Sequence, residues 1–410
     1  MSKFYKIRNA DGKCWWMPVR GMRVGLALYQ PSGWKGRLLK CLLPYLHWSW
    51  LVRKALGIET VDSQQSTVNS QRSTDFDASR FFLTEDIFSH GTHGIFSLKA
   101  QRPLVHGNAE ASPACHSDNI YTMDSLLRRV VCEAFGVREF DYSVFWGTPS
   151  VHQKATIQVW NEERILGYVK LTESEEVGRL FFQEMNFLKK VNDQRSTVNG
   201  LLVPEAWAMV LGIDKVWVLI QTTRKSLRSE MVREWGELQE SFLERLYDAT
   251  VQEIEWEESD VAKSLCDLRE HIDWLPNGVD GEAVVKRIDA VVECMKGKRV
   301  RYGAYHGDFT PWNMFVERGE LFVFDWEYAG WGYPKGLDCY HFWMQTAIFE
   351  KHWGVEELRR YMCSVDGEWI DREMLEVYLL DVMSKYVMRE GEKVKDMGLF
   401  GIWCSLLKEL

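Results

Sequence analysis

The segment HGDFTPWN, residues 306–313, places an aspartate and an asparagine five positions apart in a short polar loop. An apolar stretch, residues 314–316, follows at once. A turn-like segment, residues 317–320, then leads to a second apolar stretch that runs into Asp325. This layout predicts a hairpin with polar side chains at both of its ends.

Two carboxylates and an amide brought together in this way suit phosphoryl transfer. Asn313 and Asp325 supply the hard oxygen ligands that Mg²⁺ prefers, and Mg²⁺ shares its shell with phosphates and water. Asp308 could then accept the proton of a hydroxyl, because this chemistry depends mostly on positioning and charge neutralisation. A lone aspartate after glycine is usually only a turn residue, but the joint pattern of loop, hairpin and FDWE favours the catalytic interpretation.

The same chemistry needs a cation for the phosphates, and Lys170 is the candidate. It ends the strand-like stretch YVKL, the type of position at which a kinase places its phosphate-pairing lysine. In the helix expected over residues 174–191, Glu184 falls on the apolar face. An unpaired buried charge is costly, so we expect Glu184 to pair with Lys170. An exposed lysine and a rim glutamate are the alternative.

A cover over the phosphates is expected at the turn WGTPS, residues 146–150. The backbone there, at Gly147, and the hydroxyls of Thr148 or Ser150 would face the phosphates. Because the turn has a single glycine, an ordinary hairpin turn explains it almost as well.

The elements that must position these residues form a sheet-rich part followed by a helix-rich part. Helical patterns dominate from residue 226 to 300 and again after 338. We therefore expect an α+β fold with a small β-sheet N-lobe that carries one helix and a large, mainly helical C-lobe. The expected strands are residues 142–147, 154–160, 165–171 and 215–221.

The residue pattern of the first part of the chain differs from that of the rest, which predicts an extra N-terminal domain with loop-like segments. A helical pattern restarts near residue 123, and the domain boundary is placed there. The expected domains are residues 1–122 for the accessory domain, 123–222 for the N-lobe and 223–410 for the C-lobe with its catalytic loop, residues 306–313.

The composition is that of an ordinary globular protein, with 46% hydrophobic and 27% charged residues among 410. A net charge of −9 without a long basic block gives no footprint for nucleic acid. Nine cysteines without a C-x-x-C pair or a zinc-type spacing indicate reduced thiols in a cytoplasmic protein. The N-terminus lacks an apolar core of signal-peptide length, and the longest apolar run, residues 41–52, is too short to span a bilayer.

One segment, residues 33–56, combines a helical pattern with basic and aromatic residues. Such a helix could lie on the anionic inner face of a membrane, and a helix packed on its own domain would have the same composition. Peripheral membrane contact through this segment is therefore one expectation. The pattern does not indicate an oligomeric state.

Two stretches resemble a known family. HGDFTPWN and FVFDWEYAGWGYPKGLDCYHF are similar to the motifs of the aminoglycoside phosphotransferase and choline kinase superfamily, whose fold is similar to that of protein kinases. The resemblance is specific over residues 306–343, less so from about 140 to 303, and does not include roughly the first 120 residues. The second stretch is closest to choline, ethanolamine and thiamine kinases.

This resemblance implies ATP and Mg²⁺ as cofactors. It makes Asp308 the catalytic base, Asn313 and Asp325 the magnesium ligands, and Lys170 with Glu184 the pair that positions the phosphates.

It also implies supporting roles. Asp338 would brace the catalytic loop by hydrogen bonds, and His306 would be a packed, hydrogen-bonded loop residue. The nucleotide base would hydrogen-bond the backbone around Ile220, Gln221 and Thr222.

The acceptor is expected to be a small molecule, because the D-F-G and A-P-E motifs of protein kinases are absent. An acid and an aromatic box close to the metal site suit a cationic amino alcohol, and a carbohydrate would stack on the same rings. The sequence thus predicts an ATP-dependent kinase for a hydroxyl of a sugar, a glycan end or an amino alcohol. The candidate acceptor-site residues are Glu327, Tyr328, Trp331 and His341.

Two rival functions come from other interpretations of the same features. A nucleotide-binding pseudokinase or scaffold would use the kinase lobes only to organise a partner, but it would have no need of the full set of catalytic residues. An antibiotic phosphotransferase would need an acidic pocket for polycationic drugs. Its lining would be Glu255, Glu257, Glu258 and Asp260.

Overall fold

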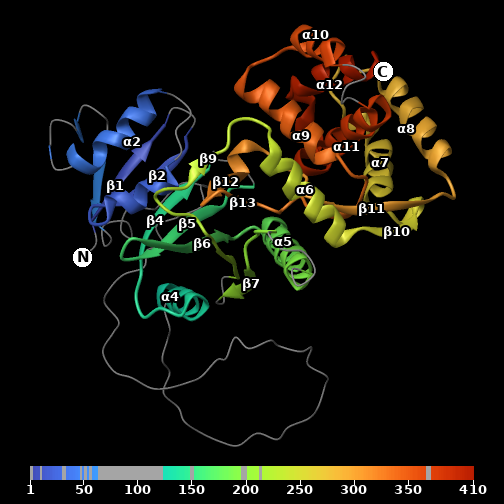
Figure 1. Ribbon diagram of the computed structural model, residues 1–410. Helices are drawn as coiled ribbons and strands as arrows, with labels where there is room; N and C mark the ends of the chain where they lie inside the picture. Colours follow the sequence, from blue (N-terminus) through green and yellow to red (C-terminus); the bar gives the residue numbers. More distant parts are fainter. Residues whose placement is uncertain are drawn as a thin grey trace, which may run out of the picture. The chain divides into compact units, whose positions relative to one another are not determined.

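The fold divides into two compact units. Unit 1 comprises Met1–Met185 and Glu205–Leu227, and unit 2 comprises Asn186–Pro204 and Arg228–Leu410. The structure is a computed structural model, whose elements are labelled in Figure 1. It describes residues 3–9, 12–29, 34–46, 49, 53–54, 58–62, 123–147, 152–194, 201–211, 215–365 and 371–410.

Unit 1 is built on one sheet in which every neighbouring pair of strands is antiparallel. The four strands expected from the sequence are present and are labelled β4, β5, β6 and β8, whereas β1, β2, β3 and β7 were not expected. The strands are β1 Lys3–Arg8, β2 Cys14–Pro18, β3 Glu59–Asp62, β4 Asp141–Trp146, β5 Ala155–Asn161, β6 Arg164–Thr172, β7 Ala206–Leu211 and β8 Val216–Thr222.

The strand order is β3-β1-β2-β4-β5-β6-β8-β7 (Figure 1). Two helices pack on opposite faces of this sheet. The α4 helix, Met123–Phe135, shares a core with Val218 and Ile220 of β8. The α5 helix, Glu175–Asp193, packs Val177 and Phe181 against Leu219 of the same strand. Side chains alternate between the two faces along a strand, so each helix covers one set of alternate residues.

The same alternation places Lys170. Its neighbours on β6, Val169 and Leu171, are buried in the core that contains α4. Lys170 must therefore point to the other face, where α5 lies. The expected α+β fold is confirmed, although the sheet-bearing unit carries more than one helix.

The first 62 residues correct the expected domain boundary at 122. β2 pairs with β4, and Trp15 lies opposite Phe145, so the N-terminal strands extend the sheet of the expected N-lobe. Within residues 33–56 the structure describes the α2 helix, Trp34–Leu46, which packs Leu39 and Leu43 into a core with residues of β1 and β2. The composition of this region could not reveal a pairing between segments so far apart in the sequence.

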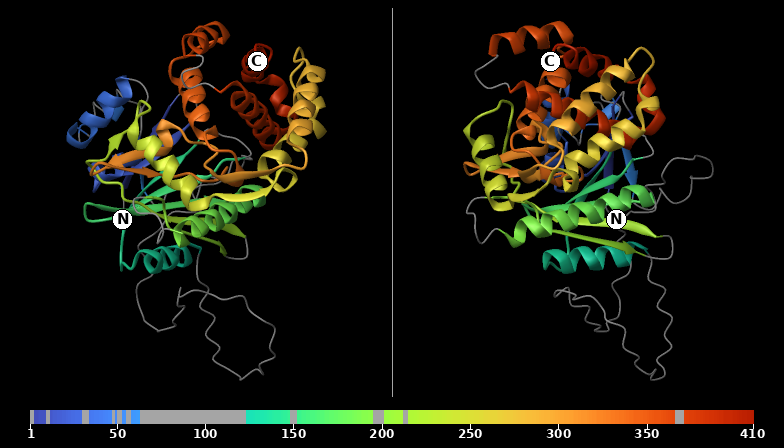
Figure 2. Two further views of the ribbon diagram at one scale, coloured as in Figure 1. Left: turned by 45° about the vertical axis from the view of Figure 1, so that its right-hand side comes forward. Right: turned by 90° about the vertical axis from the view of Figure 1, so that its right-hand side faces the viewer.

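Unit 2 is mainly helical, as predicted for the C-lobe (Figure 2). Side chains cap several of its helices, as when Asp371 accepts a hydrogen bond from the Met374 N–H at the start of the helix that contains Tyr378. The core includes fully buried Trp403, Phe400 and Tyr378. The α-helices are α6 Glu237–Thr250, α7 Asp260–Glu270, α8 Gly281–Met295, α9 Leu337–Gln345, α10 Val355–Val365, α11 Arg372–Glu390 and α12 Leu399–Leu407.

Short strands in unit 2 frame the polar loop of residues 306–313. The predicted hairpin is present, with Met314 opposite Val323 and a two-residue turn, Arg318 and Gly319, in which both φ angles are positive. Such a turn matches the natural twist of a hairpin. The strands are β9 Glu230–Met231, β10 Gln252–Glu255, β11 Arg299–Tyr305, β12 Met314–Glu317, β13 Glu320–Val323 and β14 Gly330–Tyr333.

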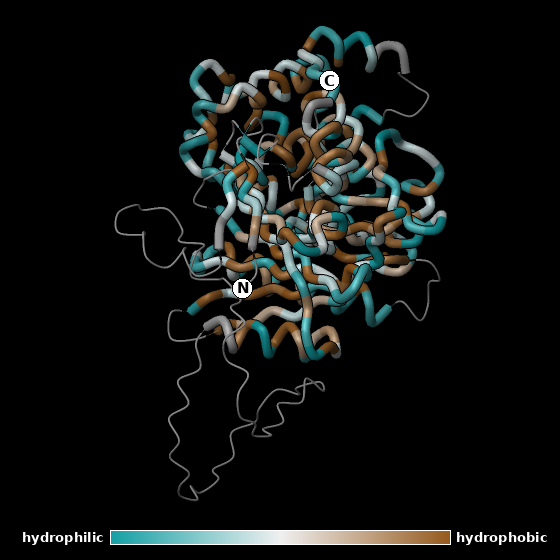
Figure 3. The backbone as a smooth tube through the Cα atoms, turned by 90° about the vertical axis from the view of Figure 1, so that its left-hand side faces the viewer, coloured by the Kyte–Doolittle hydropathy of each residue, from teal (hydrophilic) through white to brown (hydrophobic). Residues whose placement is uncertain are grey.

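The distribution of apolar residues follows these elements. Figure 3 shows hydrophobic and hydrophilic segments alternating along α4, as expected for a helix with one buried face. In the part of the chain that the structure describes, no helix is both long enough and apolar enough to cross a membrane.

Candidate active site

The polar loop follows β11 and is braced by the first turn of α9. The Asp338 carboxylate accepts hydrogen bonds from the backbone N–H groups of His306, at 2.8 Å, and Gly307, at 3.1 Å. Gly307 has a φ of 80°, and a Cβ atom there would collide with the backbone of Tyr328, so only glycine fits. Asp338 thus lies where the sequence analysis expected a bracing residue.

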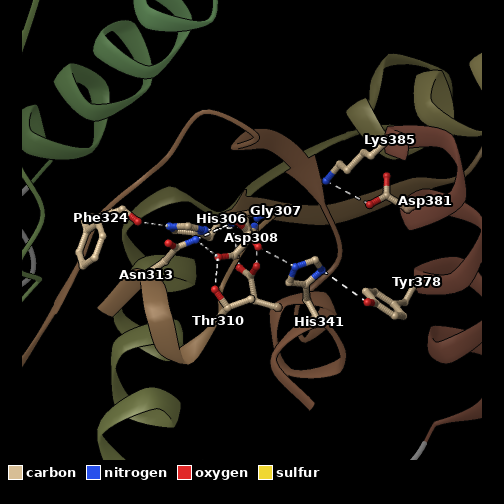
Figure 4. A network of polar contacts seen from close by, with 11 residues as sticks. His306, Gly307, Asp308, Thr310, Asn313, Phe324, His341, Tyr378, Asp381 and Lys385 are labelled. Atoms are coloured by element: carbon tan, nitrogen blue, oxygen red, sulfur yellow. Dashed lines mark hydrogen bonds and ion pairs between the residues drawn. The ribbon is translucent and has the colours of Figure 1, made fainter. Parts of the chain in front are cut away.

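Asp308 is held at both of its carboxylate oxygens (Figure 4). The Asn313 side-chain amide donates to Oδ2 at 2.8 Å, and His341 Nε2 lies 3.1 Å from Oδ1. His341 follows Asp338 by three residues on α9, so both side chains share the helix face that contacts the loop. Tyr378 on α11 lies behind, with its hydroxyl 3.4 Å from His341 Nδ1.

These contacts define the proton positions on His341. An ionised carboxylate only accepts hydrogen bonds, so Nε2 of the neutral ring carries the proton that faces Asp308. Nδ1 is then an acceptor, and the Tyr378 hydroxyl donates to it. His341 was expected in the acceptor site, and the sequence pattern did not indicate its contact with the Asp308 carboxylate.

His306 is fully buried and connects the loop to the hairpin. Its Nδ1 accepts from the Asp308 backbone N–H at 3.2 Å, and its Nε2 lies 3.1 Å from the Phe324 carbonyl oxygen. The ring is therefore neutral with its proton on Nε2. Burial lowers the pKa of His306 to about 4. It is a structural residue, in line with its expected role.

The two buried groups that hold this loop affect stability in opposite ways as pH changes. The folded-state pKa of His306, about 4, lies below its ordinary 6.5, so stability falls as pH drops through this interval. Burial raises the pKa of Asp338 to about 6 from 3.8, although its hydrogen bonds oppose this shift, so stability falls as pH rises through that interval. At about 1.4 kcal/mol per unit, the two effects nearly cancel between about pH 4 and 6.

Replacing Asp338 with asparagine is therefore expected to expose the acid sensitivity of His306. Between pH 7 and pH 4, the free energy of unfolding of the variant should fall by about 3 kcal/mol more than that of wild type, measured by urea denaturation. The Asp396→Asn variant changes an exposed carboxylate and serves as the control. Parallel pH profiles for wild type and Asp338→Asn would contradict the opposed titrations.

Asp325 and Asn313 are the candidate metal ligands. The Phe324 backbone N–H donates to the Asn313 backbone carbonyl oxygen at 3.0 Å, which ties the end of β13 to the loop. Asp325 comes next with a φ of 67°, an uncommon conformation that aspartate tolerates and that is often found at functional sites.

The chemistry of these donors fits Mg²⁺. The Asn313 NH₂ group is used by Asp308, so its amide oxygen is the atom suited to bind a cation. Among the described residues there is no group of three or more His, Cys, Asp or Glu side chains that could hold a metal ion. Two oxygen ligands match Mg²⁺, which takes most of its shell from phosphates and water.

Unit 1 holds the second part of the predicted site. Lys170 Nζ lies 3.0 Å from Glu184 Oε2, and both side chains are buried. The Gln221 side chain donates to Glu184 Oε1 at 2.9 Å, so it supports this ion pair from β8. Because breaking such a pair leaves a buried charge, each partner depends on the other for its stability.

Other nucleotide-site expectations differ in detail. The Thr222 backbone N–H donates to the Glu205 carbonyl at 2.9 Å, so this donor is already used within the sheet and is a poor partner for a nucleotide base. The carbonyl of Gly147, at the end of β4, accepts from Gln153 at 3.0 Å. Thr148 and Ser150 lie outside the described residues.

A cavity of about 250 Å³ opens beside Asp308 in unit 2. Tyr328 and His341 from the expected acceptor site line it, whereas Glu327 and Trp331 do not. Trp331 instead packs against Phe187, with ring centroids 4.5 Å apart.

Besides Val382, three polar or charged residues of α11 also line this cavity and were not expected. They are Lys385, Tyr386 and Arg389. Lys385 and Arg389 lie in a helix that also carries several acidic residues, so their presence in the sequence is not specific for a site.

The acidic run expected for an antibiotic pocket serves other purposes. Asp260 accepts from the Trp331 and Gly332 backbone N–H groups, at 2.9 and 3.3 Å. Glu257 accepts from the Gly297 N–H at 2.9 Å. Neither carboxylate lines the cavity beside Asp308, so this run does not form its wall.

The fold and the geometry of the site agree with the arrangement expected of a protein-kinase-like phosphotransferase. A buried lysine–glutamate pair lies between β6 and α5, and the H-G-D-x-x-x-x-N loop lies in the helical unit. Residues 223–361 match the sequence model of the phosphotransferase enzyme family (APH). The resemblance inferred from the motifs and the prediction of a phosphotransferase are thereby confirmed.

Other comparisons are more distant. No curated protein matches the chain. Similar solved structures are a putative fructosamine-3-kinase from Haemophilus somnus 129PT (12% identity, 69% of this chain and 96% of that chain, TM-score 0.41) and choline kinase LicA from Streptococcus pneumoniae (14%, 69% and 97%, 0.41). Aminoglycoside phosphotransferase APH(4)-Ia with ADP and hygromycin B is also similar (12%, 69% and 98%, 0.45). At TM-scores below 0.5, these likenesses do not indicate an acceptor.

Proposed function

We propose that this protein is an ATP-dependent kinase that transfers the γ-phosphoryl group to a hydroxyl of a small molecule. The observation that carries this proposal is the environment of Asp308. Its carboxylate is oriented by His341 and Asn313, on a loop braced by Asp338, and it borders a cavity of about 250 Å³. A carboxylate fixed in this way is suited to orient a hydroxyl and accept its proton.

Each residue of the site then has a role. Lys170, held by Glu184, would position the nucleotide phosphates, and Asn313 and Asp325 would hold the magnesium ion. Magnesium, when bound, neutralises charge on the phosphates. As the bond between the acceptor oxygen and phosphorus forms and the bond to ADP breaks, the hydroxyl proton moves to Asp308.

The lining of the cavity favours a sugar or glycan hydroxyl over a cationic amino alcohol. Among the residues that line it, Asp308 is the sole carboxylate, whereas Lys385 and Arg389 are cations. Their carboxylate partners, Asp381 at 3.1 Å and Glu390 at 2.7 Å, lie outside the lining. A positively charged acceptor would meet two cations at the cavity wall, so a neutral acceptor is the better match.

Aromatic rings in the cavity lining provide a surface on which a sugar ring can stack. Tyr328 and Tyr386 line the cavity, and the Arg389 guanidinium lies 5.9 and 4.4 Å from their centroids. Aromatic faces beside a fixed guanidinium suit a ring that carries hydroxyl groups, because such a ring can stack and hydrogen-bond at once.

The first test is ADP release by the purified protein with ATP, Mg²⁺ and a panel of sugars, glycan ends, amino alcohols and aminoglycosides. Acceptor-dependent ADP release is expected. ATP binding without release for any acceptor would favour the pseudokinase alternative, and no ATP binding would refute the proposal.

Acceptor charge gives a sharper prediction. For matched acceptors, kcat/KM should be at least about tenfold higher for a neutral sugar than for its amino-sugar counterpart, since like charges about 8 Å apart repel by about 2 kcal/mol. Arg389→Gln should narrow this gap, whereas Arg360→Gln, at an exposed arginine on α10, should not. An unchanged preference in Arg389→Gln would show that this cation does not set selectivity.

A further inference from the structure

The outer face of α2 in unit 1 is apolar. Leu38, Leu42 and Tyr45 are 50%, 43% and 73% exposed, and their spacing of four and three residues places them on one side of the helix. Leu39 and Leu43 form the inner stripe that packs on the sheet. The helix is therefore fixed to unit 1 by one apolar stripe while it presents a second one outward. We call Leu38, Leu42 and Tyr45 the α2 surface.

This grouping is not typical of the rest of the molecule. In the part of the chain that the structure describes, nine large apolar side chains are exposed, and three of them belong to α2. Singly exposed apolar residues need no explanation, whereas a cluster on one helix face often marks an interaction site. The other six lie on separate segments: Val210, Leu227, Met231, Leu238, Phe349 and Met388.

Charge indicates what covers the α2 surface. Residues 33–56 contain five lysines and arginines and no aspartate or glutamate, in a chain whose net charge is −9. Arg37 is exposed beside the apolar stripe, and Arg53 is anchored to unit 1 through Tyr5, with its guanidinium 5.5 Å from the ring centroid. Basic residues next to an apolar stripe match the two attractions of an anionic lipid surface.

The aromatic residues point to the same occupant. The segment also contains three tryptophans, at positions 34, 48 and 50, as well as Tyr45. Tryptophan and tyrosine are enriched at the boundary between lipid headgroups and acyl chains. A second copy of the chain is a poorer match, because a symmetric contact through α2 would bring each basic segment close to its own copy.

We propose that the α2 surface binds anionic membranes, with Leu38, Leu42 and Tyr45 inserted among the headgroups and the basic residues next to lipid phosphates. This inference is independent of the kinase proposal, since neither Asp308 nor the cavity contributes to it. Binding is peripheral and reversible, because the apolar stripe is short and the helix also packs on its own sheet.

The test is sedimentation of the full chain with vesicles of phosphatidylcholine, with and without about 30% phosphatidylserine. Binding is expected only to the anionic vesicles, and about 0.5 M salt should weaken it severalfold. Leu42→Glu should reduce the vesicle partition coefficient more than tenfold. The matched control is Leu238→Glu, at a leucine of α6 that is 37% exposed, and it should bind as wild type does.

Two results would overturn the proposal. One is equal sedimentation of wild type and Leu42→Glu while both melt at the same temperature. The other is a stable dimer of wild type that Leu42→Glu dissociates, which would assign the α2 surface to a second copy of the chain. ATP binding by Leu42→Glu should equal that of wild type, so failure of vesicle binding remains distinguishable from failure of the kinase function.

Discussion

Asp308→Asn protein is expected to bind ATP as wild type does and to lose about 10³-fold or more in kcat. A positioned general base typically contributes about 10² to 10⁴, and asparagine cannot take a proton at neutral pH. Steady-state kinetics with the acceptor found in the panel, together with equilibrium nucleotide binding, would measure the two quantities separately.

The surroundings of Asp308 predict that this variant folds normally. Asparagine can keep its oxygen toward the Asn313 amide and turn its NH₂ group toward His341 Nε2. His341 then carries its proton on Nδ1. The Tyr378 hydroxyl, 3.4 Å from Nδ1, donates to this atom in wild type and can accept its hydrogen bond in the variant. The loss of unfolding free energy should stay within about 1 kcal/mol, since each hydrogen bond is replaced.

A fall in kcat of less than tenfold would show that Asp308 is not the base. A parallel fall in nucleotide affinity would indicate that the substitution had disturbed the loop instead. The Asp396→Asn variant, at an exposed position on the same unit, gives the baseline for a charge change without a role in the site.

The parts of the site that local sequence could predict share a physical cause. Asp308, Asn313 and Asp325 belong to one loop and its hairpin, so their separation is set by turn geometry over a few residues. The positions of Lys170 and Glu184 follow from the side-chain periods of their elements, which are two residues along β6 and 3.6 residues along α5. Such short-range patterns are visible without knowledge of tertiary contacts.

The remaining features depend on contacts between segments far apart in the chain. β2 joins β4 across more than 120 residues, which no local pattern encodes, so an accessory domain was expected where the sheet continues. Lys385 and Arg389 reach the cavity only because α11 packs beside the catalytic loop. His341 was recognised as a site residue, but its partner Tyr378 lies 37 residues away on another helix, so its position behind Asp308 could not be derived.

Lys170→Met is expected to be the most destabilising single change at the site. It leaves the Glu184 carboxylate fully buried, with a hydrogen bond from the Gln221 amide but without its cation, and loss of one partner of a buried ion pair costs about 3–5 kcal/mol. Urea unfolding of unit 1, followed by tryptophan fluorescence, would measure this loss.

The double variant Lys170→Met with Glu184→Gln separates stability from function. A neutral glutamine keeps the hydrogen bond to Gln221 and leaves no buried charge, so most of the unfolding free energy should return. The KM for ATP should remain raised about tenfold or more, because no cation is restored for the phosphates. If the double variant recovered both stability and nucleotide affinity, the pair would support the fold of unit 1 without contributing to phosphate binding.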